Sequence, residues 1–348
     1  MGSNWTWGKM DLIPVKYSIK DEKKIASRIS EWIYDNIFAG IFDILKISNR
    51  VYNANTDIVQ NAIIQGKIYY QNGAFYSYTK RFNNEIAREL ENIGAKYSKY
   101  RKAYVISENK LPTNILWAIE TEKTRTATTV RAIVEFLTMR LGAINTDSLI
   151  IDEFVNQLML NLQKQVYKNA QAKKIELISP KLDDFTKNEI TQNYINNLDF
   201  WIKNFTETEI VKMRKDLSAM ILEGKSTKFI SEYIQKRYDI SKRKALFLAR
   251  NESAIATTSY LIAKYQAEGI NSYKWSTSHD ERVRELHRKL DGQIFTFDNP
   301  PIIDERTQQR GHCGQTFNCR CIMIPQIDKD FLQRRRELYE KNHRLVKL

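Results

Sequence analysis

The sequence lacks any long apolar run. No stretch approaches the ~20 consecutive apolar residues that a helix needs to cross a bilayer. The opening residues, MGSNWTWGKMDLIPVKYSIK, also lack the apolar core of a secretory signal peptide. The sequence therefore predicts neither an association with membranes nor export through a signal peptide.

Cysteine is scarce and confined to one place. The chain of 348 residues has 3 cysteines, and all of them lie in the stretch GHCGQTFNCRC at 311–321. An odd number of clustered cysteines argues against the paired disulfide framework of small secreted domains. The pattern favours folding in a reducing compartment, and it raises the question of a metal site.

Acidic residues are outnumbered by basic ones. The chain has 55 Lys and Arg against 41 Asp and Glu, which gives a formal net charge of +14. A net positive protein attracts polyanions through counterion release, without reading a base sequence. The run of Arg334, Arg335 and Arg336 in the C-terminal segment supplies candidate DNA contacts. The alternative for any single run of this kind is a solvated helical face.

Glycine is sparse in the central region, and the connections there are rich in asparagine. Residues 111–240 read almost entirely as helix. The pattern predicts a break between helices at 185–205 and 207–224, and a second break at 239–241. Long helices with polar faces are typical of assembly surfaces rather than of a compact catalytic fold.

A small insert interrupts the helical pattern after an N-terminal helical arm over 1–65. Residues 66–110 begin with GKIYYQNGAFYSY, whose aromatic flanks surround Asn72-Gly73, the strongest short hairpin signal. A helix and a third strand at 102–107 follow, which predicts a ββαβ insert. Its aromatic side chains have the residue types that stack on bases. Packing of the hairpin onto the helix is the favoured interpretation, because aromatics are ordinary strand formers.

The last part of the chain differs in kind from the helical region. Residues 241–327 predict a small α+β domain with a loop at 299–311, and 328–348 form a basic tail. The predicted elements are three strands and one short helix, at 273–276, 293–297, 319–324 and 282–290. The fold class is therefore mostly α, with an elongated helical N-terminal region, the small insert, an α+β domain and a basic C-terminal helix.

Two features of this part concern buried polar chemistry. Side chains at i and i+2 share one face of a strand, so Cys319 and Cys321 are expected to point to one side and Arg320 to the other. In the preceding helix, Glu252 lies on an otherwise apolar stripe. A buried carboxylate needs a cationic or hydrogen-bonding partner. We expect an arginine from the following segment to supply it.

Several residue types stand in a fixed order over roughly 240–325. They are Glu252, Trp275, Asp280, Arg282, Arg284, His287, Gly292, Asn318 and Arg320, together with Cys319 and Cys321. This series resembles the phage Mu F-like head morphogenesis family, also called minor head proteins. The resemblance is weak elsewhere in the chain. One departure is Arg310-Gly311, where relatives often have Pro-Gly, and it affects the expected shape of that loop.

The resemblance implies a non-enzymatic virion component. Such a protein lies in the head interior or at the portal vertex and is assembled in the host cytoplasm. Its implied partners are the portal protein, scaffold or major capsid proteins, and packaged double-stranded DNA bound without sequence specificity. The resemblance also implies a role in head morphogenesis or in the fate of the DNA after ejection. It implies no cofactor.

The cysteine cluster admits several interpretations. Cys313, Cys319, Cys321 and either His287 or His312 supply the ligands that zinc prefers, but the C-x5-C-x-C spacing lacks the usual C-x2-C knuckle. The favoured alternative is a closing strand whose cysteines act as small apolar residues. In that case Asp280, Arg284 and His287 form polar cross-links that fix the loop. A disulfide from Cys313 ranks third, and a catalytic thiol with His287 as base is remote.

A second enzymatic alternative is ADP-ribosyl transfer, because Mu F-like domains are sometimes fused to toxin domains of that class. Arg250 followed by Ser276-Thr277-Ser278 matches its arginine and Ser-Thr-Ser elements superficially. The Glu-x-Glu that this chemistry requires is missing, and without paired acids there is no general base. The sequence therefore predicts a non-enzymatic protein, with a zinc-binding or transferase-like enzyme as the alternative.

Overall fold

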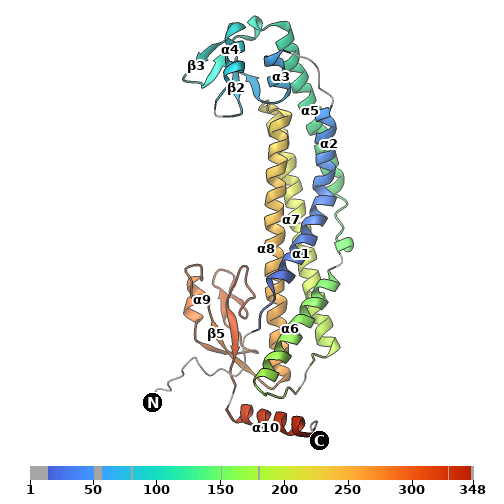
Figure 1. Ribbon diagram of the computed structural model, residues 1–348, viewed down its shortest axis with the longest axis vertical. Coiled ribbons are helices and arrows are strands. Elements are labelled where there is room, and N and C mark those ends of the chain that lie inside the picture. Colours follow the sequence, from blue (N-terminus) through green and yellow to red (C-terminus); the bar gives the residue numbers. More distant parts are fainter. Residues whose placement is uncertain are drawn as a thin grey trace. The chain divides into compact units, whose positions relative to one another are not determined.

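Helices make up most of the computed structural model, which describes residues 15–50, 57–79, 81–149, 151–178, 181–327 and 329–345. The helices are α1 (Ile19–Ile33), α2 (Ala39–Arg50), α3 (Ile58–Ile64), α4 (Asn84–Asn92), α5 (Thr113–Leu141), α6 (Asp152–Ala172), α7 (Asp184–Leu222), α8 (Thr227–Ala267), α9 (Glu285–Leu290) and α10 (Lys329–Leu345) (Figure 1). The mostly α fold class is confirmed. Over the described residues, no helix is both long enough and apolar enough to cross a membrane.

The chain divides into two compact units that are not consecutive in sequence. The first unit combines 1–29, 147–202 and 243–348, and the second combines 30–146 and 203–242. Helices α1, α7 and α8 therefore contribute residues to both units. The predicted segments, in contrast, were consecutive stretches of sequence.

Helices α7 and α8 are continuous, so the predicted breaks at 206 and 239–241 are wrong. Neither place contains glycine or proline, the residues that most readily end a helix. Thr206 is fully buried within α7. In α8 the hydroxyl of Ser241 donates to the carbonyl oxygen of Arg237, one turn earlier, at 3.1 Å. A serine that bonds to the preceding turn in this way can lie within a long helix without interrupting it.

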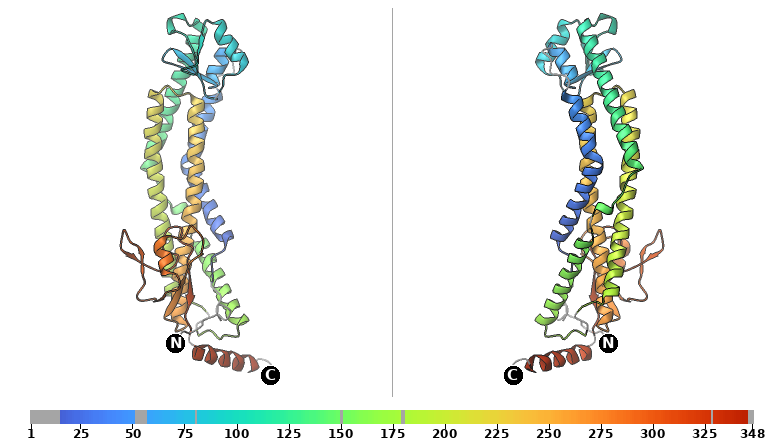
Figure 2. Two further views of the ribbon diagram at one scale, coloured as in Figure 1. Left: turned by 90° about the vertical axis from the view of Figure 1, so that its left-hand side faces the viewer. Right: turned by 90° about the vertical axis from the view of Figure 1, so that its right-hand side faces the viewer.

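Polar pairs join α7 and α8 within the second unit, where the two helices lie side by side (Figure 2). The guanidinium of Arg237 donates two hydrogen bonds to the buried carboxylate of Glu209. The hydroxyl of Tyr233 donates to Asp216 Oδ2 at 2.7 Å. Charge-assisted pairs with this two-point geometry orient the helices as well as attracting them.

A buried carboxylate caps the first turn of α8. The backbone N–H of Thr227 donates to Glu122 Oε1 at 2.9 Å, and Arg125 forms an ion pair with the same carboxylate. Burial raises the pKa of Glu122, while the charge of Arg125 opposes this shift. An acidic group at a helix N-terminus also interacts favourably with the helix dipole.

The insert contains the predicted ββα order and one more strand than expected. Its strands are β1 (Ile68–Gln71), β2 (Ala74–Ser77), β3 (Lys96–Ser98) and β4 (Ala103–Val105), in the antiparallel order β1-β2-β4-β3. Asn72 and Gly73 both have positive φ, at 50° and 76°. A type I′ turn requires this conformation, and it explains the hairpin. The sequence analysis missed β3, which is short and exposed.

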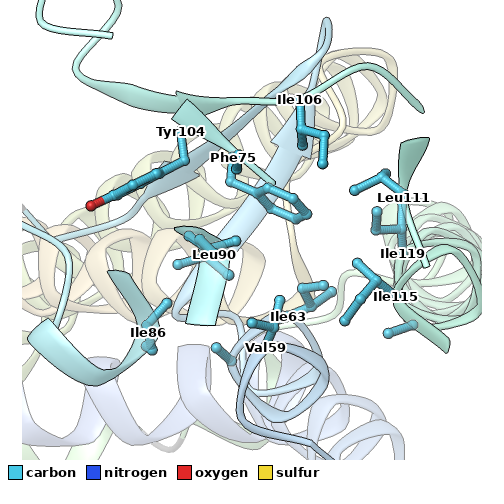
Figure 3. Packing of buried hydrophobic residues seen from close by; sticks show 14 of the residues in the cluster. Val59, Ile63, Phe75, Ile86, Leu90, Tyr104, Ile106, Leu111, Ile115 and Ile119 are labelled. Atoms are coloured by element: carbon cyan, nitrogen blue, oxygen red, sulfur yellow. The ribbon is translucent and has the colours of Figure 1, made fainter. Parts of the chain in front are cut away.

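Apolar side chains from α3, α4, α5 and the sheet form the core of the insert (Figure 3). Phe75 and Leu90 are fully buried at its centre. The tyrosines of the hairpin contact one another: the ring centroids of Tyr69 and Tyr76 lie 5.3 Å apart, and those of Tyr69 and Tyr78 lie 4.7 Å apart. Phe75 thus packs toward α4, as favoured from the sequence, whereas the three tyrosines stack on one another and Tyr78 also contacts Phe229 of α8.

The C-terminal α+β domain (272–325) is built on a three-stranded antiparallel sheet. Its strands are β5 (Ser272–Ser276), β6 (Ile294–Thr296) and β9 (Ile322–Pro325), in the order β6-β5-β9. The predicted loop at 299–311 is not irregular throughout, because it contains the hairpin of β7 (Ile302–Asp304) and β8 (Gln309–Arg310).

The boundaries around the motif residues differ from prediction by three residues. Strand β9 begins at residue 322, not 319, because Asn318 adopts a positive φ of 55° and the extended residues after it make no strand pairs. Helix α9 begins at residue 285, not 282, because Asp280 Oδ1 accepts the N–H of Arg282 at 3.0 Å and holds a turn there.

We predict that Phe75→Ala destabilises the insert by about 3–5 kcal/mol, because it removes a fully buried ring from the centre of the core. The matched control is Tyr100→Ala, whose side chain is 96% exposed, and which should change stability by less than about 0.5 kcal/mol. Hydrogen exchange of the β1, β2 and β4 amides over a urea series measures both. Equal effects of the two substitutions would contradict the assigned core.

Candidate functional site

The candidate site begins with two buried aromatic groups. Trp275 on the central strand β5 is fully buried, and its indole packs edge-to-face against the imidazole of His287 on α9, with ring centroids 5.4 Å apart and an interplanar angle of 74°. His287 is 2% exposed. Figure 1 shows α9 and β5 within the C-terminal domain. The sheet thus fixes the position of the imidazole.

The hydrogen bonds of His287 define its tautomer. Its Nε2 lies 3.3 Å from the carbonyl oxygen of Ile303 in β7. A carbonyl oxygen only accepts, so Nε2 carries a hydrogen, and in the neutral ring Nδ1 presents its lone pair. That lone pair faces two thiols: Nδ1 is 3.5 Å from Cys321 Sγ and 3.6 Å from Cys319 Sγ. The predicted shared face of the two cysteines is therefore directed at His287.

The two thiols form a coupled pair. The pKa of Cys319 is lowered, chiefly by its hydrogen bond with Cys321 and further by that with His287. The pKa of Cys321 is raised by the same contact with Cys319 and by burial. The backbone N–H of Gly314 also donates to Cys319 Sγ at 3.4 Å. The pair therefore loses its first proton readily and its second with difficulty.

Cys313 and His312 lie outside this cluster. Over the described residues, the ligand atoms that lie within 4.8 Å of one another belong to His287, Cys319 and Cys321. Cys313 is buried, and burial raises the pKa of its thiol. His312 Nδ1 is instead 3.0 Å from the hydroxyl of Tyr273. The structure thus brings together three of the four predicted metal ligands. All three thiols are free.

A glycine allows the cysteine loop to approach α8. Gly314 has a φ of +87°, and a Cβ atom at this position would lie 2.6 Å from the hydroxyl oxygen of Thr258. The same hydroxyl donates to the carbonyl oxygen of Cys313 at 2.6 Å. A hydrogen bond therefore holds the loop against α8, and the two lie so close that position 314 has no room for a side chain.

The opposite face of the cysteine segment is held by ion pairs. The guanidinium of Arg320 donates two hydrogen bonds to the carboxylate of Asp280, and these bonds hold the pKa of Asp280 below its usual range. Arg284 donates to the carbonyl oxygen of Phe317. Arg282 lies at the edge of the group, 3.9 Å from Asp280. Together these contacts tie the residues before α9 to the residues before β9.

Gly292, the glycine of the motif, forms the turn that connects α9 to the sheet. Gly292 adopts a positive φ of 78°, and its N–H donates to the carbonyl oxygen of Trp275 at 2.8 Å. The turn therefore returns the chain from α9 directly to β5.

Glu252 is buried as expected, at 1% exposed, but the arginine partner was wrong. Asn251 Nδ2 donates to Glu252 Oε1 at 2.9 Å, and the described residues contribute no cation to this carboxylate. Burial raises the pKa of Glu252 against this hydrogen bond. The nearby Arg250 pairs with Glu22 of α1 instead, at 2.9 Å. The environment of Glu252 thus favours its neutral form.

The arginine run of α10 is divided between the surface and the interior. Arg334 and Arg336 are exposed, whereas Arg335 is buried at 8% exposed. Arg335 donates to Glu268 Oε2 at 3.2 Å, and Lys264 donates to Glu268 Oε1 at 2.6 Å. Arg335 therefore holds α10 in place, and its assignment as a DNA contact is wrong.

Two backbone groups complete the candidate site and were missed by sequence reasoning. The carbonyl oxygen of Ile303 fixes the imidazole, and the N–H of Gly314 contacts Cys319. Every residue carries such groups, so no sequence signal marks them. They could be found only after the β7–β8 hairpin and the loop had been placed.

The segment that contains the candidate site is similar in sequence to known proteins. Residues 211–324, which include every motif residue described above, match the family model described as Phage Mu protein F like protein. The chain is 30% identical over 136 residues to Minor head protein GP7 of Bacillus phage SPP1, covering 36% of this chain and 44% of that protein. No solved structure gives a significant match.

Two further relatives have different descriptions. An uncharacterized protein of Haemophilus influenzae is 33% identical over 129 residues, covering 37% of this chain and 28% of that protein. NAD(+)--arginine ADP-ribosyltransferase EFV of Enterococcus faecalis is 30% identical over 122 residues, covering 31% and 24%. The chain thus covers less than half the length of each of these three relatives.

We predict that Glu252→Gln stabilises the protein at pH 7. A carboxyl group whose pKa is raised on folding holds its proton more tightly in the folded state than in the unfolded state, which ionises above about pH 4.3. Stability is therefore lost as pH rises from that value toward the raised pKa of Glu252. Glutamine does not ionise and so removes this loss. The gain in stability of Glu252→Gln over the native chain should therefore shrink toward pH 4. Urea unfolding at the two pH values measures it.

The matched substitution is Glu268→Gln, which should destabilise the protein by about 3–5 kcal/mol, because it leaves Lys264 and Arg335 buried without their anion. The same urea unfolding measures this loss. Opposite signs for these two buried glutamates are the expected result. A loss of stability in Glu252→Gln at pH 7 would contradict the neutral carboxyl.

Proposed function

We propose, on the premise that residues 211–324 match the Phage Mu protein F like family, that the chain is a minor head protein located at the portal vertex or in the head interior. The observation that carries this proposal is the family match over the segment that holds the Asp280–Arg320 pair and the cysteine cluster. The likeness to Minor head protein GP7 supports the same role.

The proposed role is structural rather than enzymatic. Of the elements that resemble an ADP-ribosyltransferase, Arg250 is paired with Glu22 of α1. Ser276 is the buried last residue of β5, and the N–H of the next residue, Thr277, donates to Asp291 at 2.8 Å. These groups have structural partners, and the sequence lacks the paired acids that this chemistry needs.

The proposal extends to packaged DNA. The net charge of +14 favours association with a polyanion, and Arg334 and Arg336 present exposed guanidinium groups on α10. Contacts of this kind bind phosphates through counterion release and carry no sequence information. Binding should therefore weaken steeply with salt and depend little on base sequence.

The experiment that tests the head assignment is particle purification. Phage particles are separated from soluble lysate on a density gradient and then cross-linked. Mass spectrometry should find this chain in the particles, and cross-linked to the portal protein. A chain that stays entirely in the soluble fraction, with the other head proteins present in particles, would overturn the proposal.

The DNA contact has its own matched test. The double substitution Arg334→Gln/Arg336→Gln should lower the slope of log K against log salt by about 2, since each phosphate contact contributes about 0.9. The control is Lys96→Gln/Lys99→Gln, which removes equal charge from exposed positions of the insert. Gel shifts over a salt series compare the two. Equal reductions in slope would refute a contact through α10 and leave only net charge.

A further inference from the structure

We propose that His287, Cys319 and Cys321 bind one zinc ion, through the imidazole Nδ1 and the two cysteine Sγ atoms. The three ligand atoms come from α9 and from the segment before β9, and they lie within 4.8 Å of one another. This metal site is independent of the proposed location in the phage head.

The separations fit a tetrahedral zinc site. With Zn–S near 2.3 Å and Zn–N near 2.0–2.1 Å, a tetrahedral angle places S and N about 3.6 Å apart. The two observed separations from His287 Nδ1 are 3.5 Å to Cys321 Sγ and 3.6 Å to Cys319 Sγ. Both nitrogen–sulfur separations therefore match those around one zinc ion, and the two sulfur atoms also lie within 4.8 Å of each other.

The electron pairs of the three ligand atoms suit a cation. Because Nε2–H donates to Ile303, His287 Nδ1 has a single lone pair for two neighbouring thiols. Only one S–H group can donate to that lone pair at a time. A metal ion accepts electron pairs from the imidazole and both sulfurs together.

The surrounding groups are those that commonly orient zinc ligands. Histidine ligands usually donate their second N–H to a carbonyl or carboxylate, as His287 does to Ile303. The N–H of Gly314 contacts Cys319 Sγ and suits a thiolate. The edge-to-face contact with Trp275 limits rotation of the ring. The ligand geometry is therefore supported before any ion binds.

The chemical types of the three ligands favour zinc over magnesium and calcium. Thiolates and imidazole suit zinc, whereas magnesium and calcium require oxygen ligands. Three protein ligands leave the fourth position of the tetrahedron to water. Cys313 is a buried thiol close in sequence to these ligands. It does not belong to the group of ligand atoms that lie within 4.8 Å of one another, so the proposal leaves it uncoordinated. This residue provides a matched control.

The site should also stabilise the domain. A shared ion joins residue 287 to residues 319 and 321 and closes the long intervening stretch that contains the β7–β8 hairpin. An ion that binds these ligands in the folded state and not in the unfolded chain adds its binding free energy to the stability of the fold.

The test is metal analysis of the whole chain, purified under reductant and then titrated with zinc chloride. The native chain and Cys313→Ala should bind one zinc per chain. His287→Asn, Cys319→Ser and Cys321→Ser should lose more than about 100-fold in affinity, because loss of a mere outer-shell partner typically costs 10–100-fold. Cobalt titration of the native chain should give a sulfur-to-cobalt charge-transfer band, and Cys319→Ser should weaken it.

Stability provides a second readout that does not depend on every variant folding well. A chelator should lower the Tm of the native chain and of Cys313→Ala, and should leave that of His287→Asn unchanged. The proposal is overturned if the native chain binds neither zinc nor cobalt, or if Cys313→Ala loses zinc as severely as the three ligand variants. Zinc retained at native affinity by His287→Asn would overturn it equally.

Discussion

The ion pair between Arg320 and Asp280 determines which way the neighbouring cysteines face. Side chains alternate along an extended segment, so an arginine held outward by two hydrogen bonds directs the residues on either side inward. His287 receives both thiols there, and Ile303 fixes its tautomer. The inner cluster thus depends on a partly exposed pair on the opposite side of the chain.

Helix α8 shows how a long element remains continuous through polar surroundings. Glu122 accepts the N–H of Thr227 at its first turn, and beyond its last turn Glu268 accepts from Lys264 and Arg335. Between them, Glu252 is buried and accepts from Asn251, with no cation beside it among the described residues. Three glutamates along one helix therefore have three environments: Glu122 from α5 caps it, Glu268 beyond its end is a paired anion, and burial raises the pKa of Glu252 within it.

Local sequence rules predicted what depends on local geometry. The hairpin at Asn72-Gly73 and the shared face of Cys319 and Cys321 follow from turn chemistry and side-chain alternation. The wrong predictions concern features that depend on contacts with distant segments of the chain. Arg335 appeared to be a surface cation until Glu268 was placed beside it, and the β7–β8 hairpin has too few residues to leave a pattern. The predicted helix breaks failed because polar residues were read as loops, whereas burial and backbone contacts accommodate them within helices.

The close approach of Gly314 to Thr258 has a consequence for sequence variation. A Cβ atom at position 314 would lie 2.6 Å from the hydroxyl oxygen of Thr258, which itself donates to the carbonyl oxygen of Cys313. Neither position can change alone, since a larger residue at 314 strains the backbone and collides with the helix. A smaller residue at 258 would free the loop. Positions 258 and 314 should therefore evolve together. A comparison of the cysteine and histidine positions alone would overlook this contact, which helps to hold the cysteine loop in place.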